Sequence, residues 1–199
     1  MSKTVICYGD SNTFGYDPTS FMGGQYPREQ RWVNILEAKT GLKFRNEGMC
    51  GREIPQLQYE ISLLCRRLTE WLPEKESCDL WIMLGTNDLL MHPGITAAQV
   101  TARMDTLLQV LIDQPLFQSE AYRLRLLSPP HMRPGTWITD NQTLAESQKM
   151  DACFAALAHK LGIPVTLTGT WNIPLSFDGV HFTAEGHIQF AGQLYEEIF

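Results

Sequence analysis

Two kinds of segment alternate along the chain. Short runs rich in apolar and β-branched residues predict strands, and longer segments with apolar residues every three or four positions predict helices. The predicted strands are residues 4–9, 42–48, 79–85, 122–128 and 163–169. Helical spacing is plain over residues 96–113, 143–161 and 184–198. Strands and helices that alternate in this way predict a parallel sheet covered by helices on both faces.

Residues that cap helices support these boundaries. Thr143 and Glu146 have the spacing of a capping box, and Thr183 is a good N-cap for the last helix. Gly41 and Gly162 stand where a helix end favours a left-handed residue. No repeat, low-complexity tract or flexible linker divides the sequence, so we expect one domain over residues 1–199.

Composition narrows the class of protein and of partner. The 199 residues are 44% hydrophobic and 19% charged, with a net charge of −6, as in a globular protein. An acidic chain argues against a nucleic acid or an anionic membrane as its main partner. No apolar stretch approaches the ~20 residues of a membrane span, and the N-terminus reads as a strand and not as a signal peptide. Five cysteines without metal-site spacing favour a cytoplasmic protein with reduced thiols.

Two stretches, residues 16–30 and 129–140, fit no regular element. Both are rich in proline, glycine or aromatic residues and follow predicted strands at their carboxyl ends, where open α/β sheets bind their ligands. They are either walls of a pocket or plain connections. Composition does not decide the oligomeric state, and a homo-oligomer is one of the states it allows.

Candidate chemistry lies near both ends of the chain. Ser11, in "YGDSNTFG", follows the first strand, and Asp178 and His181 stand three residues apart in "DGVH". A serine nucleophile needs a base, and the base needs an orienting group. A parallel sheet brings both segments to its carboxyl edge. The alternatives are a helix-capping serine, a turn-forming aspartate and a packing histidine.

Two further motifs offer N–H donors at the same edge. Asn87, in "GTND", follows the most hydrophobic strand, and its amide is suited to an oxyanion; Thr86 and Asp88 are expected to hold its loop in shape. Gly51, in "GMCGR", allows close approach of a backbone N–H. Both motifs are also ordinary turn sequences. Metal-ligand spacing and glycine-rich phosphate motifs are missing from the sequence, so we expect no metal and no nucleotide cofactor.

In order, "GDSNT", "GMCGR", "GTND" and "DGVH" resemble the four sequence blocks of the SGNH, or GDSL-like, hydrolases over nearly the whole chain. The resemblance implies a three-layer, flavodoxin-like α/β/α fold with a five-stranded parallel sheet. It also implies serine ester hydrolysis through an acyl-enzyme. By position, Ser11 matches the nucleophile, Asp178 the orienting acid and His181 the general base. The backbone N–H groups of Ser11 and Gly51 and the side chain of Asn87 match the oxyanion hole.

The sequence departs from the family pattern at two positions. Asn12 follows the serine where many relatives have a hydrophobic residue, which predicts an altered pocket nearby. Cys50 precedes Gly51 where a small serine is common, and we interpret it as structural, with sensitivity to thiol reagents left open. The segments "RW", "LSPP" and "HFT" look most like small bacterial arylesterases and acyltransferases.

The expected substrate is therefore a small acyl ester. A carbohydrate acetylesterase, a thioesterase and a lysophospholipase, which would use the same triad, are the alternatives. A non-catalytic ligand-binding module is the alternative from another class.

Overall fold

The structure is a computed structural model that describes residues 3–71, 77–119, 121–138 and 140–199. Its core is a five-stranded, wholly parallel sheet with the strand order β2-β1-β3-β4-β5. The strands are β1 (Lys3–Gly9), β2 (Lys43–Gly48), β3 (Ser77–Met83), β4 (Tyr122–Leu127) and β5 (Val165–Thr166). This order makes the fold doubly wound, with its switch point at β1 and β3. The predicted α/β/α architecture is confirmed.

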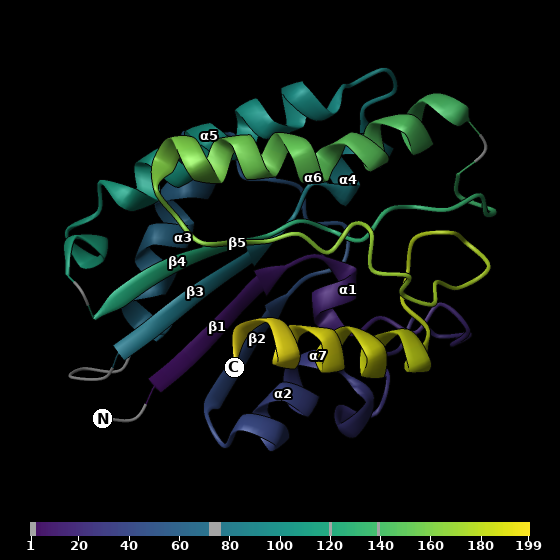
Figure 1. The fold of residues 1–199 in the computed structure, drawn as a ribbon, viewed down its shortest axis with the longest axis horizontal. Helices are drawn as coiled ribbons and strands as arrows, with labels where there is room; N and C mark the ends of the chain where they lie inside the picture. The colour runs from purple at the N-terminus through teal and green to yellow at the C-terminus, as the bar shows by residue number, and fades with distance from the viewer. Residues whose placement is uncertain (1–2, 72–76, 120, 139) are drawn as a thin grey trace.

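Helices cover both faces of the sheet (Figure 1). The α-helices are α1 (Ser11–Phe14), α2 (Trp32–Thr40), α3 (Gln58–Trp71), α4 (Thr86–Met91), α5 (Ala97–Ile112), α6 (Asn141–Leu161) and α7 (Ala184–Ile198). Helices α2 and α7 pack on one face, and α3, α5 and α6 on the other. The short helices α1 and α4 begin directly beyond the carboxyl ends of β1 and β3.

Alternation along the central strands divides the core into two layers. Val5 and Cys7 of β1 are buried in the cluster that includes α2 and α7. Ile6 and Tyr8 are buried in the cluster that includes α3, α5 and α6. The apolar run of β1 is therefore explained by burial on both sides, as expected for a central parallel strand.

The fifth strand is much shorter than predicted. It comprises only Val165–Thr166, whereas the predicted span was 163–169. Beyond it, the backbone N–H of Thr168 donates to Ser128 Oγ at 2.8 Å and its hydroxyl donates to the Ser128 carbonyl. Hydrogen bonds that involve side chains replace the backbone pairing of β4 and β5 at this point. The apolar pattern of the sequence does not indicate this change.

The predicted capping box of α6 is wrong. The helix begins at Asn141, and Asp140 is the N-cap, whose side chain accepts from the N–H of Thr143 at 2.7 Å. Glu146 instead reaches across to α5 and accepts from the N–H of Ala97 at 2.8 Å. The predicted ends at Gly41 and Gly162 are confirmed, since both have a left-handed backbone.

Helix α7 carries a histidine whose burial affects stability. His187 is fully buried, and its Nδ1 accepts from the backbone N–H of Trp32 at 3.5 Å. Burial, together with the nearby charge of Arg31, lowers the pKa of His187 to about 3. An unfolded histidine has a pKa near 6.5. Between these values the unfolded chain binds a proton at His187 that the folded chain does not bind.

We therefore expect His187 to reduce the free energy of unfolding as the pH falls below 6.5, by about 1.4 kcal/mol per pH unit. Asp10 acts in the opposite sense, because burial raises the pKa of its carboxyl to about 6 in the folded chain. The comparison is therefore between urea unfolding of the wild type and of His187→Asn, whose Oδ1 can still accept from Trp32, at pH 7, 6 and 5. Parallel pH dependence in the two proteins would show that His187 does not titrate in this way.

Candidate active site

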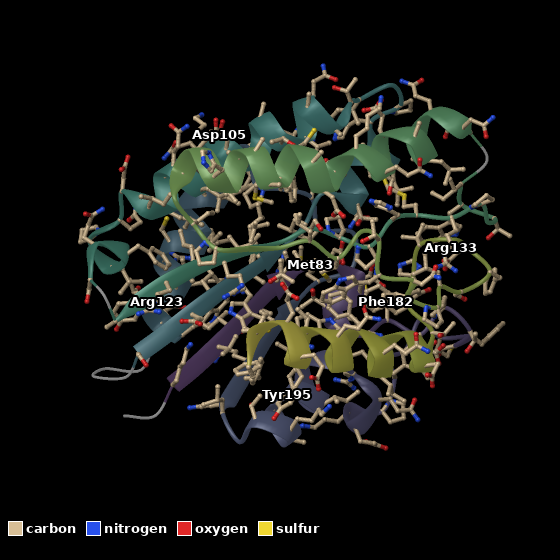
Figure 2. The ribbon with its side chains drawn as sticks, in the orientation of Figure 1. Met83, Asp105, Arg123, Arg133, Phe182 and Tyr195 are labelled. Atoms are coloured by element: carbon tan, nitrogen blue, oxygen red, sulfur yellow. The ribbon has the colours of Figure 1, made fainter. Side chains whose placement is uncertain are left out.

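The predicted site residues gather beyond the carboxyl ends of the strands. Figure 2 shows which end of the sheet this is: Arg123 marks the start of β4, and Arg133 lies in the loop beyond the carboxyl end of β4. At the end of β1, Asp10 caps α1 by accepting from the N–H of Asn12 at 2.9 Å. Ser11 is therefore the first residue of α1 and not its cap. A Cβ on Gly9 would lie only 2.1 Å from Thr13 Oγ1, so this tight turn requires glycine.

Ser11, His181 and Asp178 form a continuous hydrogen-bonded chain. Ser11 Oγ lies 2.9 Å from His181 Nε2, and His181 Nδ1 lies 2.8 Å from Asp178 Oδ2. The three residues are 5%, 3% and 1% exposed, respectively. The structure thus brings together residues 170 positions apart in an arrangement suited to proton transfer from the serine to the histidine.

The loop before α7 fixes the carboxylate of this chain. Asp178 Oδ1 accepts from the backbone N–H groups of Val180 and His181, both at 2.9 Å. Gly179, which lies between Asp178 and Val180, has φ of 81°, and a Cβ there would lie 2.0 Å from the Arg133 carbonyl oxygen. One carboxylate oxygen therefore shapes the turn, and the other holds the imidazole.

Asn12 connects the two segments that carry the serine and the histidine. Its side chain donates to the Val180 carbonyl at 3.0 Å and accepts from the N–H of Phe182 at 2.8 Å. It therefore ties the serine turn to the histidine loop. The indole N–H of Trp32 supports the same turn by donating to the Asn12 carbonyl at 3.0 Å.

The two remaining motifs lie side by side next to this chain. Asn87, in the first turn of α4, is buried, and its Nδ2 donates to the Arg52 carbonyl at 3.0 Å. Gly51 precedes Arg52 with φ of 72°, a left-handed backbone. An amide nitrogen carries two hydrogens, so the bond to Arg52 orients the Asn87 side chain and leaves one N–H available.

Asp88 holds this part of the site together, as expected. It is fully buried, accepts from the N–H of Ile54 at 3.1 Å and pairs with Arg103 at 2.8 Å. Arg103 also lies 3.3 Å from Glu53. Helix α4, helix α5 and the segment around Gly51 are therefore fixed to one another. Thr86, in contrast, begins α4 and does not sit in a loop.

Sequence reasoning missed two aromatic rings on the histidine. The ring centroids of Tyr16 and Trp137 lie 4.8 and 4.9 Å from that of His181. They come from the two irregular stretches, residues 16–30 and 129–140. The backbone N–H of Trp137 also donates to the Asp178 carbonyl at 3.3 Å, and the Trp137 side chain is half-exposed. The aromatic content of these stretches was visible, but which ring contacts the histidine depends on how the loops fold back.

A pocket of about 590 Å³ is lined in part by Gly51 and Arg52. Residues 49–57 and helix α3 supply most of its lining, together with Tyr8, His92 and Arg103. Neither irregular stretch contributes a residue to this pocket. Residues 130–133 of the second stretch instead help to line a separate pocket of about 340 Å³.

Cys50 is exposed next to Gly51 and is a free thiol. Burial and the nearby Asp10 raise the pKa of the Cys50 thiol. Among the described residues, no three histidine, cysteine or carboxylate side chains are grouped to hold a metal ion. Within the same residues, no helix is both long and apolar enough to cross a membrane.

Comparison with solved structures finds proteins of the same fold. The chain is similar to a proposed arylesterase from Agrobacterium tumefaciens str. C58, with 27% identity, a TM-score of 0.84 and 98% of each chain covered. A carbohydrate acetylesterase family member from Sinorhizobium meliloti is 25% identical, with a TM-score of 0.81 and coverage of 98% of this chain and 96% of that one.

An aryl esterase from M. smegmatis, 22% identical over 99% of this chain and 98% of that one, has the same fold with a TM-score of 0.82. A comparison with curated proteins finds no match. The family model described as GDSL-like lipase/acylhydrolase matches residues 7–188, which include all four sequence blocks. The chain therefore belongs to the GDSL-like lipase/acylhydrolase family of hydrolases.

Proposed function

We propose that the protein is a serine esterase that cleaves small acyl esters through an acyl-enzyme on Ser11. The observation that carries this proposal is the chain of hydrogen bonds from Ser11 Oγ to His181 Nε2 and from His181 Nδ1 to Asp178. A serine hydroxyl is a weak nucleophile until an oriented base accepts its proton. The membership of the family and the two esterase-like neighbours point to the same class of reaction.

In the first half-reaction, Ser11 Oγ attacks the ester carbonyl as His181 Nε2 accepts the hydroxyl proton. The tetrahedral intermediate collapses when the bond to the alcohol oxygen breaks, and His181 gives that oxygen its proton. In the second half-reaction, His181 takes a proton from water, whose oxygen attacks the acyl-enzyme. The acid then leaves and Ser11 regains its proton. An alcohol in place of water yields a new ester.

Negative charge forms on the carbonyl oxygen in both steps. Fixed N–H donors stabilise it without reorganising, typically by about 3 kcal/mol each. We propose that the backbone N–H groups of Ser11 and Gly51 and the amide of Asn87 supply them. Ser11 supports this role because its N–H opens helix α1, whose first N–H groups have no partner within the helix.

The rings of Tyr16 and Trp137 pack against His181 and occupy the space beside it, which supports short acyl groups as substrates. The free thiols of Cys7, Cys50, Cys65 and Cys153 support a reducing compartment such as the cytoplasm. The similarity to a carbohydrate acetylesterase family member makes acetylated sugars the second substrate class to test.

A substrate panel tests this proposal. We expect kcat/KM to be highest for p-nitrophenyl acetate and to fall for the butyrate and octanoate esters. Xylose tetraacetate, acetyl-CoA and lysophosphatidylcholine provide the comparison with the three alternative esterase classes. A tenfold preference for one of these would replace the substrate assignment, and no turnover of any ester would overturn the enzymatic one. Added propanol should yield propyl acetate if the acyl-enzyme also transfers to alcohols.

A further inference from the structure

Arg52, the last residue of "GMCGR", is linked to each of the three proposed oxyanion donors, a role that the motif itself did not suggest. It follows Gly51 directly, and its side chain returns toward the sheet. There its Nη1 donates to the Gly9 carbonyl at 2.8 Å and also to the Glu47 carbonyl. One guanidinium thus joins the end of β1, just before the Ser11 turn, to the end of β2, just before the Gly51 loop.

The backbone of Arg52 makes the third connection. Its carbonyl accepts from Asn87 Nδ2 at 3.0 Å, so the position of residue 52 sets the rotation of the Asn87 amide. All three proposed donors are therefore linked to this residue: Ser11 through Gly9, Gly51 through the peptide bond and Asn87 through the carbonyl. These donors come from three segments that are distant in the sequence.

The surroundings of the guanidinium hold it in one place. It lies over the Tyr8 ring, 4.1 Å from the ring centroid, in the wall of the 590 Å³ pocket. Burial raises the pKa of Asp10, the residue that caps the serine helix, and the positive charge of Arg52 acts to lower that pKa. A planar group with five donors can bond two carbonyls and stack on a ring at once, which an ammonium group cannot do.

We propose that Arg52 is a positioning residue that holds the three oxyanion donors in register. The proposal rests on the esterase function proposed above. The donors must lie within a few tenths of an ångström of the place where the oxyanion forms, and a 1 Å misplacement can cost about 100-fold in rate. Loss of Arg52 therefore affects the transition state more than the binding of substrate.

The test compares Arg52→Met and Arg52→Lys with the wild type, using p-nitrophenyl acetate. We expect Arg52→Met to lower kcat by about 10- to 100-fold while KM changes less than twofold. Arg52→Lys, which keeps the charge and one donor at a time, should recover part of the loss. Arg123→Met is the control, because Arg123 is an exposed arginine at the start of β4, at the opposite end of the strand from the site, and should keep the wild-type kcat. Rates are referred to the folded fraction measured by circular dichroism.

The outcomes separate this proposal from the esterase function. If the wild type has no activity, or if Ser11→Ala is equally active, both proposals fail. If Ser11→Ala is inactive but Arg52→Met keeps kcat within twofold, only the role of Arg52 is wrong. Should Arg52→Met not fold, the lysine variant decides: a three- to tenfold lower kcat at unchanged KM supports the proposal, and wild-type kcat overturns it.

Discussion

Replacement of Ser11 by alanine should lower kcat for p-nitrophenyl acetate by about 10⁴- to 10⁶-fold. The variant loses the only atom that can form the acyl-enzyme, and His181 is left without a proton to accept. The fold should survive, because the change removes one hydroxyl, whose recorded side-chain bond is the one to His181. We expect the Tm to stay within about 4 °C of the wild type, which corresponds to the loss of one hydrogen bond.

Ser128 provides a matched control for this variant. It is also fully buried at the carboxyl end of a strand, and its hydroxyl bonds to a carboxylate, Asp151, at 2.5 Å. His131 lies 3.9 Å from the other oxygen of that carboxylate, but no histidine contacts the Ser128 hydroxyl among the interactions described. Ser128→Ala should therefore lower stability and keep kcat. Equal losses of activity in the two variants would mean that Ser11 acts only through the fold.

Replacement of Asp178 by asparagine should lower kcat by about 10⁴-fold with the loop still in place. The side-chain oxygen of asparagine can still accept from the N–H groups of Val180 and His181, as Oδ1 does now. Its NH₂ group then faces His181 Nδ1, which must accept. That choice places the ring proton on Nε2, where the base toward Ser11 should be.

The activity of Asp178→Asn should stay low, because the NH₂ group of the asparagine holds His181 in the wrong tautomer. Asp140→Asn is the control: it removes a carboxylate that caps α6, and asparagine is an equally good cap. It should have wild-type kcat. An Asp178→Asn variant with more than about a tenth of wild-type kcat would remove Asp178 from the proposed proton-transfer chain.

The sequence predicted most of the fold because burial leaves a strong pattern. Strand β1 is apolar on both faces, and α5 and α7 show one apolar face each, so their type and approximate bounds follow from spacing alone. Strand β5 escaped this logic, since its pairing stops where the Ser128 hydroxyl replaces a backbone partner. One side-chain hydrogen bond decides that boundary, and residue spacing does not record it.

The candidate site was predictable in part for a similar reason. Ser11, Asp178 and His181 follow strand ends, and a parallel sheet must bring such residues to one edge. The contacts of Tyr16, Trp137 and Arg52 were not predictable, because each depends on how the loop that carries the residue folds back toward the site. Trp137 reaches His181 only because a tight turn at Gly135 lets the backbone pass Asp178, where a Cβ would lie 2.3 Å from its carbonyl carbon.

The central claim, that Ser11 is an activated nucleophile, is tested most directly by mass spectrometry after reaction with a fluorophosphonate. Attack by Ser11 Oγ forms a bond to phosphorus, fluoride leaves and His181 accepts the proton. We predict one adduct per chain, on the peptide that contains Ser11, and no adduct in Ser11→Ala. Full esterase activity with no adduct on Ser11, or an adduct on another residue that abolishes activity, would contradict this account.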